Sequence, residues 1–206
     1  PKAGGPLYLK RLQHNAPAGA QHQRQAPPAL DALTVWAKMH GHDKVQQLAQ
    51  EYARTTLLGS TTVLPGPTGE RNTLSFAARG TILCAAATSG TLMNQLAAVL
   101  ATGNQAIVLA QAPDLIPGDL PAALKDRIQI VSSLESVKHD FQIAMIEPCL
   151  DGQLKPLLAA REGALVGTIA TTQEGVIPLW LLVAERALCV NTTAAGGNAS
   201  LMMLSV

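Results

Sequence analysis

The residues of this chain that are best suited to chemistry are three cysteines, two neighbouring histidines and one hydroxyl-rich turn. A cysteine attacks a substrate or binds a metal only as the thiolate, so it needs a base, a cation or a helix N-terminus beside it. Cys84 lies in an apolar run, Cys149 follows a proline, and Cys189 lies in a late apolar run. No neighbour in the sequence clearly activates them. We predict that all three are buried, reduced and inert.

The two histidines, His40 and His42, are separated only by Gly41. Such a pair can contribute two ligands to a metal ion, but a site needs a third or fourth ligand. No cysteine or further histidine lies at a supporting spacing. We interpret the pair as exposed residues in a turn between two helices, and the sequence predicts no metal site.

The turn at Thr88, Ser89 and Gly90 separates an apolar run from a run with helical spacing. Thr88 or Ser89 can cap the helix by accepting a hydrogen bond from a free backbone N–H. A helix N-terminus also attracts anions. The turn lacks the G-x-G-x-x-G pattern that lets a backbone approach a pyrophosphate. We favour a structural turn, and these three residues are the candidates if a dinucleotide or another anion binds.

The elements that position this turn form a β-α-β unit over residues 79–110. Apolar runs of strand length at 81–87 and 105–109 flank the helix, which Gly103 ends. Two buried strands joined by a helix imply a right-handed crossover and a parallel pair. Further short strands are predicted near residues 128 and 142. The predicted fold class is therefore α/β with an open, Rossmann-like parallel sheet.

The chain is expected to divide into three parts. Residues 1–28, rich in Pro, Gly, Gln and Ala, are predicted to be a linker or flexible arm. Residues 29–163 form the Rossmann-like domain and begin with two amphipathic helices. Residues 164–206 form a small β-flap and a C-terminal tail.

The flap is predicted from a change of pattern beyond Gly163. The apolar pieces 164–170, 178–183 and 187–190 read as strands of an antiparallel or edge element outside the main sheet. A helix is predicted at 153–161, with Pro156 in its first turn.

Composition excludes several classes of protein. The 206 residues are 48% hydrophobic but only 14% charged, with a net charge of +1, so electrostatics favours neither nucleic acid nor an acidic membrane. No apolar run is long enough to span a bilayer. The positive mean hydropathy of +0.19 indicates that some apolar surface meets a partner chain or domain. The chain begins without methionine, and we expect a fragment or processed piece.

Two further motifs are predicted to shape surfaces. A rigid loop with two prolines and two glycines contains Gly66, Pro67, Thr68, Gly69, Glu70, Arg71 and Asn72. A tail motif suited to docking contains Asn191, Thr192, Ala195, Gly196, Gly197, Asn198, Leu201 and Met202. Its asparagines can bond backbone groups, its glycines allow close approach, and its apolar residues can anchor. The alternative is a tail that packs on its own domain.

Four motifs in this order carry a family resemblance: LPGPTGERN (64–72), RGTILC (79–84), QLAAVLATGN (95–104) and VNTTAAGGNASLM (190–202). Together they resemble the C-terminal region of the long proline utilization A flavoenzymes. These bacterial proteins join a proline dehydrogenase to an L-glutamate-gamma-semialdehyde dehydrogenase.

The resemblance implies a degenerate copy of the aldehyde dehydrogenase cofactor domain with a β-flap like that used for oligomerisation. It implies a non-catalytic domain that covers the aldehyde dehydrogenase site and walls the channelling cavity. The implied partners are the catalytic domain of the same polypeptide and, through the flap, a second copy. FAD and NAD would belong to the parent enzyme and not to this piece. The implied location is cytoplasmic, with the parent either free or peripheral at the inner face of the membrane.

Two other functions remain open at this point. The chain could be a binding module that retains a vestigial dinucleotide or anion site near Ser89, or an independent enzyme that uses one of its cysteines. The absent glycine fingerprint argues against the first. The absence of an activating base, of a G-x-S-x-G elbow and of other catalytic motifs argues against the second.

Overall fold

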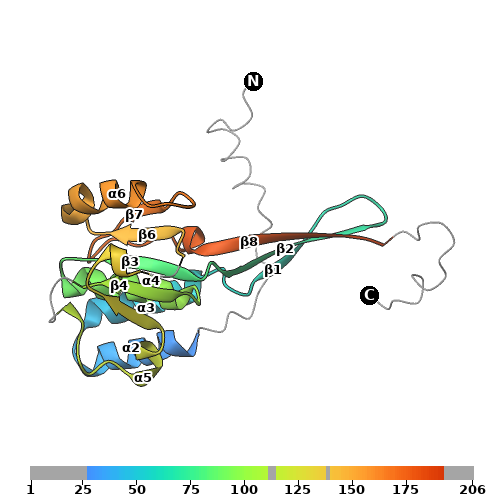
Figure 1. The fold of residues 1–206 in the computed structure, drawn as a ribbon. Helices are drawn as coiled ribbons and strands as arrows, with labels where there is room; N and C mark the ends of the chain where they lie inside the picture. The colour runs from blue at the N-terminus through green and yellow to red at the C-terminus, as the bar shows by residue number, and fades with distance from the viewer. Residues whose placement is uncertain (1–26, 111–114, 138–139, 193–206) are drawn as a thin grey trace.

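The computed structural model describes residues 27–110, 115–137 and 140–192. Figure 1 shows a layered body from which a long, narrow sheet projects as an arm. The helices of the body are α2 (Pro28–Met39), α3 (Asp43–Thr55), α4 (Ser89–Ala101), α5 (Ala122–Lys125) and α6 (Asp151–Ala159). Short 3-10 helices are η2 (Leu134–Ser136), η3 (Pro148–Leu150) and η4 (Leu179–Leu182). None of the described helices is both long and apolar enough to cross a membrane.

The body is organised by a five-stranded parallel sheet with the order β5-β4-β3-β6-β7. Its strands are β3 (Thr81–Ala85), β4 (Gln105–Leu109), β5 (Ile128–Val131), β6 (Ile143–Ile146) and β7 (Gly167–Ala170). The chain adds β4 and β5 on one side of β3 and then returns to add β6 and β7 on the other. The predicted open, Rossmann-like sheet is therefore confirmed.

Both faces of the three central strands, β4, β3 and β6, are buried, as continuous apolar strands require. Successive side chains alternate between two cores, so Ile82 and Cys84 pack in one and Leu83 and Ala85 in the other. The first core contains α2, α3 and α4, and the second contains α6. Helix α4 is buried almost all round because it lies between the sheet and the α2–α3 pair.

The two predicted N-terminal amphipathic helices are confirmed. Their buried faces are Leu30, Leu33, Trp36 and Ala37 in α2, and Val45, Leu48, Ala49 and Tyr52 in α3. Gly41 and Gly103 end their helices with φ of 70°, the left-handed conformation that a Cβ disfavours.

The arm is a separate antiparallel sheet with the order β1-β2-β8. Strands β1 (Thr61–Leu64) and β2 (Glu70–Ala78) form a hairpin, and β8 (Val183–Asn191) pairs with the whole of β2. The register runs from Ala78 opposite Val183 at the body to Glu70 opposite Asn191 at the far end.

The structure corrects the predicted composition of the flap. Strand β7 lies in the parallel sheet beside β6, not outside it. Residues 179–182 are helical (η4) where a strand was predicted. Two of the three strands of the arm come from residues 61–78, because β8 finds its partner more than 100 residues earlier in the chain. Pro156 lies inside α6 and not in its first turn, since α6 begins at Asp151.

Candidate functional site at the sheet switch point

The candidate site lies where the carboxyl ends of β3 and β6 meet. The strand order reverses between these two strands, and ligands of open α/β sheets bind in the crevice at such a switch point. The turn with Thr88, Ser89 and Gly90 follows β3, and Glu147 follows β6. The structure thus places the three predicted residues at the position that a nucleotide phosphate would need.

Thr88 is the helix cap that the sequence predicted. Its hydroxyl oxygen accepts a hydrogen bond from the backbone N–H of Thr91 at 3.3 Å. The hydroxyl also lies 2.8 Å from the Thr91 hydroxyl. Ser89 is the first residue of α4, and no cap bond is assigned to it. The cap therefore satisfies one of the N–H groups that the first turn of the helix leaves free.

The side chain of Glu147 occupies the anion position at this turn. Its Oε2 accepts hydrogen bonds from the backbone N–H of Ala87 at 2.7 Å and of Thr88 at 3.1 Å. The Thr88 hydroxyl donates to the same carboxylate, 3.3 Å from Oε1. Charge-assisted bonds of this kind are stronger than neutral ones. Glu147 thus takes the donors that a phosphate would use, and joins β3 to β6.

Gln173 covers the other side of the turn. A Cβ built on Gly90 would lie 2.4 Å from the side-chain carbonyl carbon of Gln173, so a larger residue at position 90 would require this exposed side chain to move. In a dinucleotide site the corresponding glycine allows approach of the pyrophosphate. With Glu147 in place, the backbone N–H groups of Ala87 and Thr88 are not free to bind a dinucleotide phosphate.

A cavity of about 430 Å³ remains beside the turn, between α4 and the α2–α3 connection. Its lining includes Trp36, His42, Lys44, Ser89 and Gly90. Lys44 brings one positive charge to this cavity and Asp43, which also lines it, brings one negative charge. The size of the cavity suits a small ligand.

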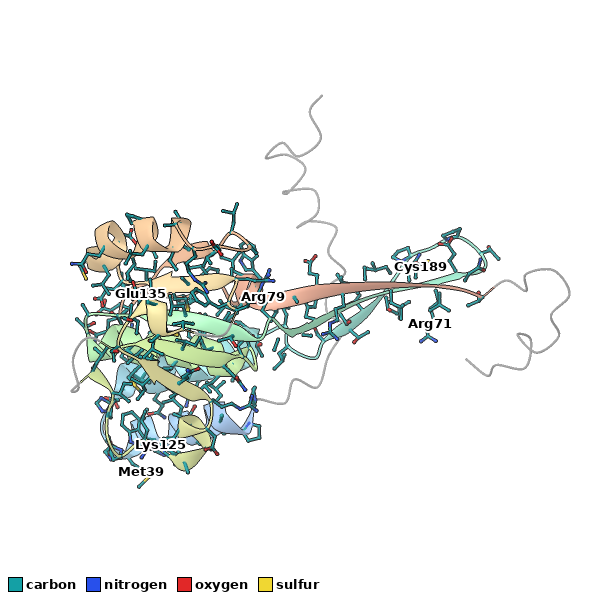
Figure 2. The ribbon with its side chains drawn as sticks, viewed as in Figure 1. Met39, Arg71, Arg79, Lys125, Glu135 and Cys189 are labelled. Carbon is teal, nitrogen blue, oxygen red and sulfur yellow. The ribbon has the colours of Figure 1, made fainter. Side chains whose placement is uncertain are left out.

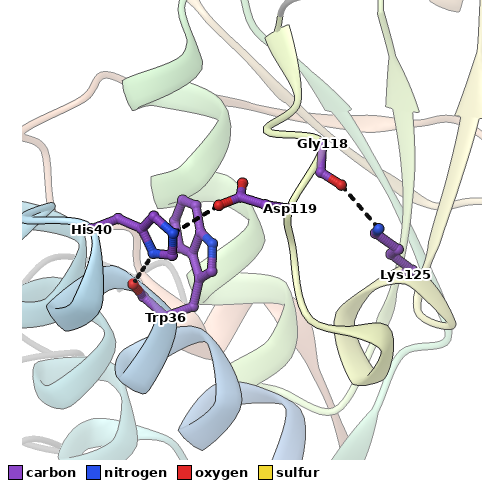
Figure 3. A network of polar contacts seen from close by, with 5 residues as sticks. All are labelled: Trp36, His40, Gly118, Asp119 and Lys125. Atoms are coloured by element: carbon purple, nitrogen blue, oxygen red, sulfur yellow. Dashed lines mark hydrogen bonds and ion pairs between the residues drawn. The ribbon is translucent and has the colours of Figure 1, made fainter.

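His40 and His42 pack against Trp36, with ring centroids 4.9 Å from the indole in both cases. The Nδ1 of His40 donates to the Trp36 carbonyl at 2.8 Å, and its Nε2 lies 2.7 Å from Oδ2 of Asp119 (Figure 3). This second contact is an ion pair when the imidazole is protonated. Among the described residues no group of three His, Cys, Asp or Glu side chains could hold a metal ion.

The structure corrects the prediction for two of the three cysteines. Cys84 is fully buried, and desolvation raises the pKa of its thiol, which keeps it protonated and inert. Cys149 and Cys189 are exposed, because η3 and the arm lie on the surface. Desolvation and the carboxylate of Glu70 raise the pKa of Cys189, which disfavours its reactive thiolate.

A buried amide on α4 binds the segment between β7 and η4, which leads to the arm. Asn94 donates from Nδ2 to the carbonyls of Thr172 and Gly175, both at 2.8 Å, and accepts from the Tyr52 hydroxyl at 2.7 Å. Tyr52 in turn accepts from the backbone N–H of Ile177 at 2.9 Å. The segment between β7 and η4 is thereby held against α3 and α4.

Gln95 adds a second connection at the base of the switch point. Its Nε2 lies within hydrogen-bond distance of the Ala85 and Met145 carbonyls and 2.7 Å from the Thr171 hydroxyl. These contacts join the ends of β3 and β6 to the residue that follows β7. Nothing in the sequence distinguished Asn94 or Gln95 from exposed helical amides.

The buried Tyr52 gives the fold a pH dependence. Burial is the largest cause that raises the pKa of its phenol from 10.0 to about 12. The unfolded chain therefore releases this proton at a lower pH than the folded chain. The free energy of unfolding should fall as the pH rises from about 10 to about 12. Denaturant titrations of the wild type across this pH range measure the fall in the free energy of unfolding, and Tyr52→Phe is the control that should lack it. If the free energies of unfolding of both proteins changed with pH in parallel, Tyr52 would not be the cause.

Replacing Glu147 by alanine should lower the free energy of unfolding by about 1–3 kcal/mol, because two backbone N–H groups lose their acceptor. Thermal unfolding of the variant measures the change. The matched control is Glu162→Ala, which removes an exposed carboxylate and should change stability by less than about 0.5 kcal/mol. Equal melting temperatures for the two variants would show that the Glu147 contact contributes nothing.

The predicted loop and tail motifs meet at the far end of the arm. The loop forms the turn of the β1–β2 hairpin, and its Glu70, Arg71 and Asn72 belong to β2. The backbone N–H of Thr192 donates to the Gly69 carbonyl at 2.7 Å. The remaining residues of the tail motif lie outside the described residues: Ala195, Gly196, Gly197, Asn198, Leu201 and Met202.

Fold and site together define an open α/β protein of the Rossmann type in which the carboxylate of Glu147 binds the turn at the switch point. No family model matches the chain. It is similar to the bifunctional protein PutA of Escherichia coli, with 37% identity over 99% of this chain, and it spans 17% of the length of that relative. The resemblance to PutA predicted from the motifs is thus confirmed, and the chain corresponds to a part of such a protein.

Solved structures are also similar to parts of this chain. A mutant of Bradyrhizobium japonicum Proline Utilization A matches with a TM-score of 0.54 and 21% identity, over 70% of this chain and 19% of that one. Substrate-bound Staphylococcus aureus AldH matches with a TM-score of 0.49 and 14% identity, over 80% of this chain and 45% of that one. The Proline Utilization A structure thus contains a part with the same fold as this chain.

Proposed function

We propose that this chain is a non-catalytic C-terminal domain of a bifunctional proline dehydrogenase and L-glutamate-gamma-semialdehyde dehydrogenase. In this proposal it covers the aldehyde dehydrogenase site, walls the cavity through which the intermediate passes, and contacts the catalytic domain of its own polypeptide. FAD and NAD act elsewhere in a cytoplasmic parent enzyme. Residues 1–28 serve as the linker, and the arm with its tail serves for docking.

The observation that carries the proposal is the carboxylate of Glu147 on the N–H groups of Ala87 and Thr88. A domain that bound NAD would keep these donors for the pyrophosphate, and would not place a negative charge there. The similarity to PutA over almost the whole chain supports the proposal that the parent enzyme is a PutA-like protein. The second candidate, an anion- or dinucleotide-binding module, is supported by the cavity that Lys44 and Ser89 line.

We expect the isolated chain to form no NADH from glutamate semialdehyde and NAD, since Glu147 takes two backbone N–H donors of the turn at its switch point. Calorimetric titration with NAD should give no binding with a Kd at or below about 10 μM, which is about −7 kcal/mol. Absorbance at the NADH maximum tests the first statement. NAD binding tighter than this would favour the dinucleotide-binding module. NADH formation would show that the isolated chain is an enzyme.

A further inference from the structure

Two helices begin at the cavity of about 430 Å³ that lies beside the switch-point turn. Its lining includes Lys44 and Val45 from the first turn of α3, and Ser89 and Gly90 from the first turn of α4. The first N–H groups of a helix have no acceptor within the helix. Among the described residues, no side chain caps the start of α3. Two helix N-termini, each with a partial positive charge, thus meet at one cavity.

A buried donor in the wall of this cavity lacks a partner. Trp36 lines the cavity and is only 4% exposed. Its Nε1–H is buried and has no hydrogen-bond acceptor among the described residues. Buried polar groups are nearly always hydrogen-bonded, so an unpaired indole N–H indicates that a further acceptor belongs beside it. A carboxylate oxygen of a bound ligand would supply that acceptor.

The cavity carries one side chain of each charge. Lys44 lies in the first turn of α3, where the helix dipole disfavours a cation, and among the described residues it forms no ion pair. Helix stability therefore does not explain its position, whereas a bound anionic group does. Asp43 also lines the cavity and adds a carboxylate at the same helix start. Asp43 would repel a ligand that is only an anion, but it would attract a ligand that also carries an ammonium group.

The walls between these charged groups are apolar. Val45, Met93 and Pro117 line the cavity together with the indole of Trp36. A bare inorganic anion would leave most of these walls uncovered, because the cavity has the size of a site for a small organic molecule. A carbon skeleton that joins the two charged groups of a ligand would cover them.

We propose that this cavity binds a small zwitterion with the carboxylate, the ammonium group and the carbon skeleton of a free α-amino acid. Its carboxylate meets the two helix N-termini, the Trp36 N–H and the Lys44 ammonium, and its own ammonium group faces Asp43. Binding does not use the N–H groups that donate to Glu147 and requires no catalysis by this chain. The inference therefore goes beyond the proposed function, and either can fail alone.

Tryptophan fluorescence tests the proposal, because the chain has only two tryptophans, Trp36 and Trp180. Trp180 is 65% exposed, so Trp180→Phe in the 206-residue chain leaves Trp36 as a single reporter in the cavity wall. The non-aromatic proteinogenic amino acids are titrated one at a time up to about 10 mM. At least one should change the emission with a Kd at or below about 1 mM. Its analogues without the ammonium group or without the carboxylate should each bind about tenfold more weakly or worse.

Two substitutions in this background separate a zwitterion site from an anion site. Lys44→Gln and Asp43→Asn should each weaken binding of the best amino acid about tenfold. Both side chains are exposed, so the variants should fold, and circular dichroism checks this. The matched control is Arg71→Gln, which removes one positive charge on the arm, away from the body (Figure 2), and should leave the Kd unchanged.

Three results would overturn the proposal. The first is an emission that no amino acid changes. The second is a Kd that Lys44→Gln leaves unchanged or alters no more than Arg71→Gln does. The third is tighter binding by Asp43→Asn, or equal binding of the analogue that lacks the ammonium group, since either would assign the cavity to a plain anion.

Discussion

Replacing Asn94 by leucine is expected to destabilise the chain by about 3 kcal/mol or more. Asn94 is fully buried, and its amide serves the Tyr52 hydroxyl and the carbonyls of Thr172 and Gly175. Leucine would leave these three polar groups without their partner, and each unsatisfied buried group costs about 1–3 kcal/mol. The segment that leads from β7 to the arm would lose its hydrogen bonds to α4. Denaturant unfolding followed by circular dichroism measures the change.

The control for this variant is Gln50→Leu, which replaces an exposed amide in α3 by the same side chain. Its free energy of unfolding should stay within about 0.5 kcal/mol of the wild type. The comparison separates the loss of hydrogen bonds from the effect of adding an apolar side chain to a helix. If Asn94→Leu were as stable as Gln50→Leu, the buried amide network would not hold the segment in place.

Local patterns in the sequence predicted much of the body. The apolar runs that became β3 and β4, the cap at Thr88 and the helix end at Gly103 all depend on neighbours within a few residues. The buried faces of α2 and α3 follow from a period of 3.6 residues. Such features need no knowledge of the tertiary fold, which explains their agreement with the structure.

Features that depend on distant parts of the chain were not predictable in the same way. The short run of β7 fits an edge strand of either sheet, and only its pairing with β6 assigns it to the body. The exposure of Cys189 follows from its place on the arm, whose central strand β2 begins more than 100 residues earlier. Glu147 was missed because its partners follow β3, although an acidic residue directly after an apolar strand could have indicated it.

Deleting residues Asn191 to Val206 from the full-length polypeptide is expected to lower aldehyde dehydrogenase turnover and coupled proline-to-glutamate flux. Asn191 pairs with Glu70 at the far end of the arm, so the tail begins there. Leu201, Met202 and Leu204 are apolar, and burying each against a partner contributes about 1.5–3 kcal/mol. Losing even one such anchor would reduce the docked population about tenfold. Proline dehydrogenase activity should stay near normal, because the proposed contact lies at the aldehyde dehydrogenase domain.

Three assays on this truncated polypeptide and its parent test whether the domain covers the aldehyde dehydrogenase site. Proline oxidation, glutamate-semialdehyde oxidation and the lag of the coupled reaction are measured separately. We expect normal proline oxidation, reduced semialdehyde oxidation and a lengthened lag. Unchanged rates in both half-reactions together with an unchanged lag would contradict the proposal that this domain covers the aldehyde dehydrogenase site.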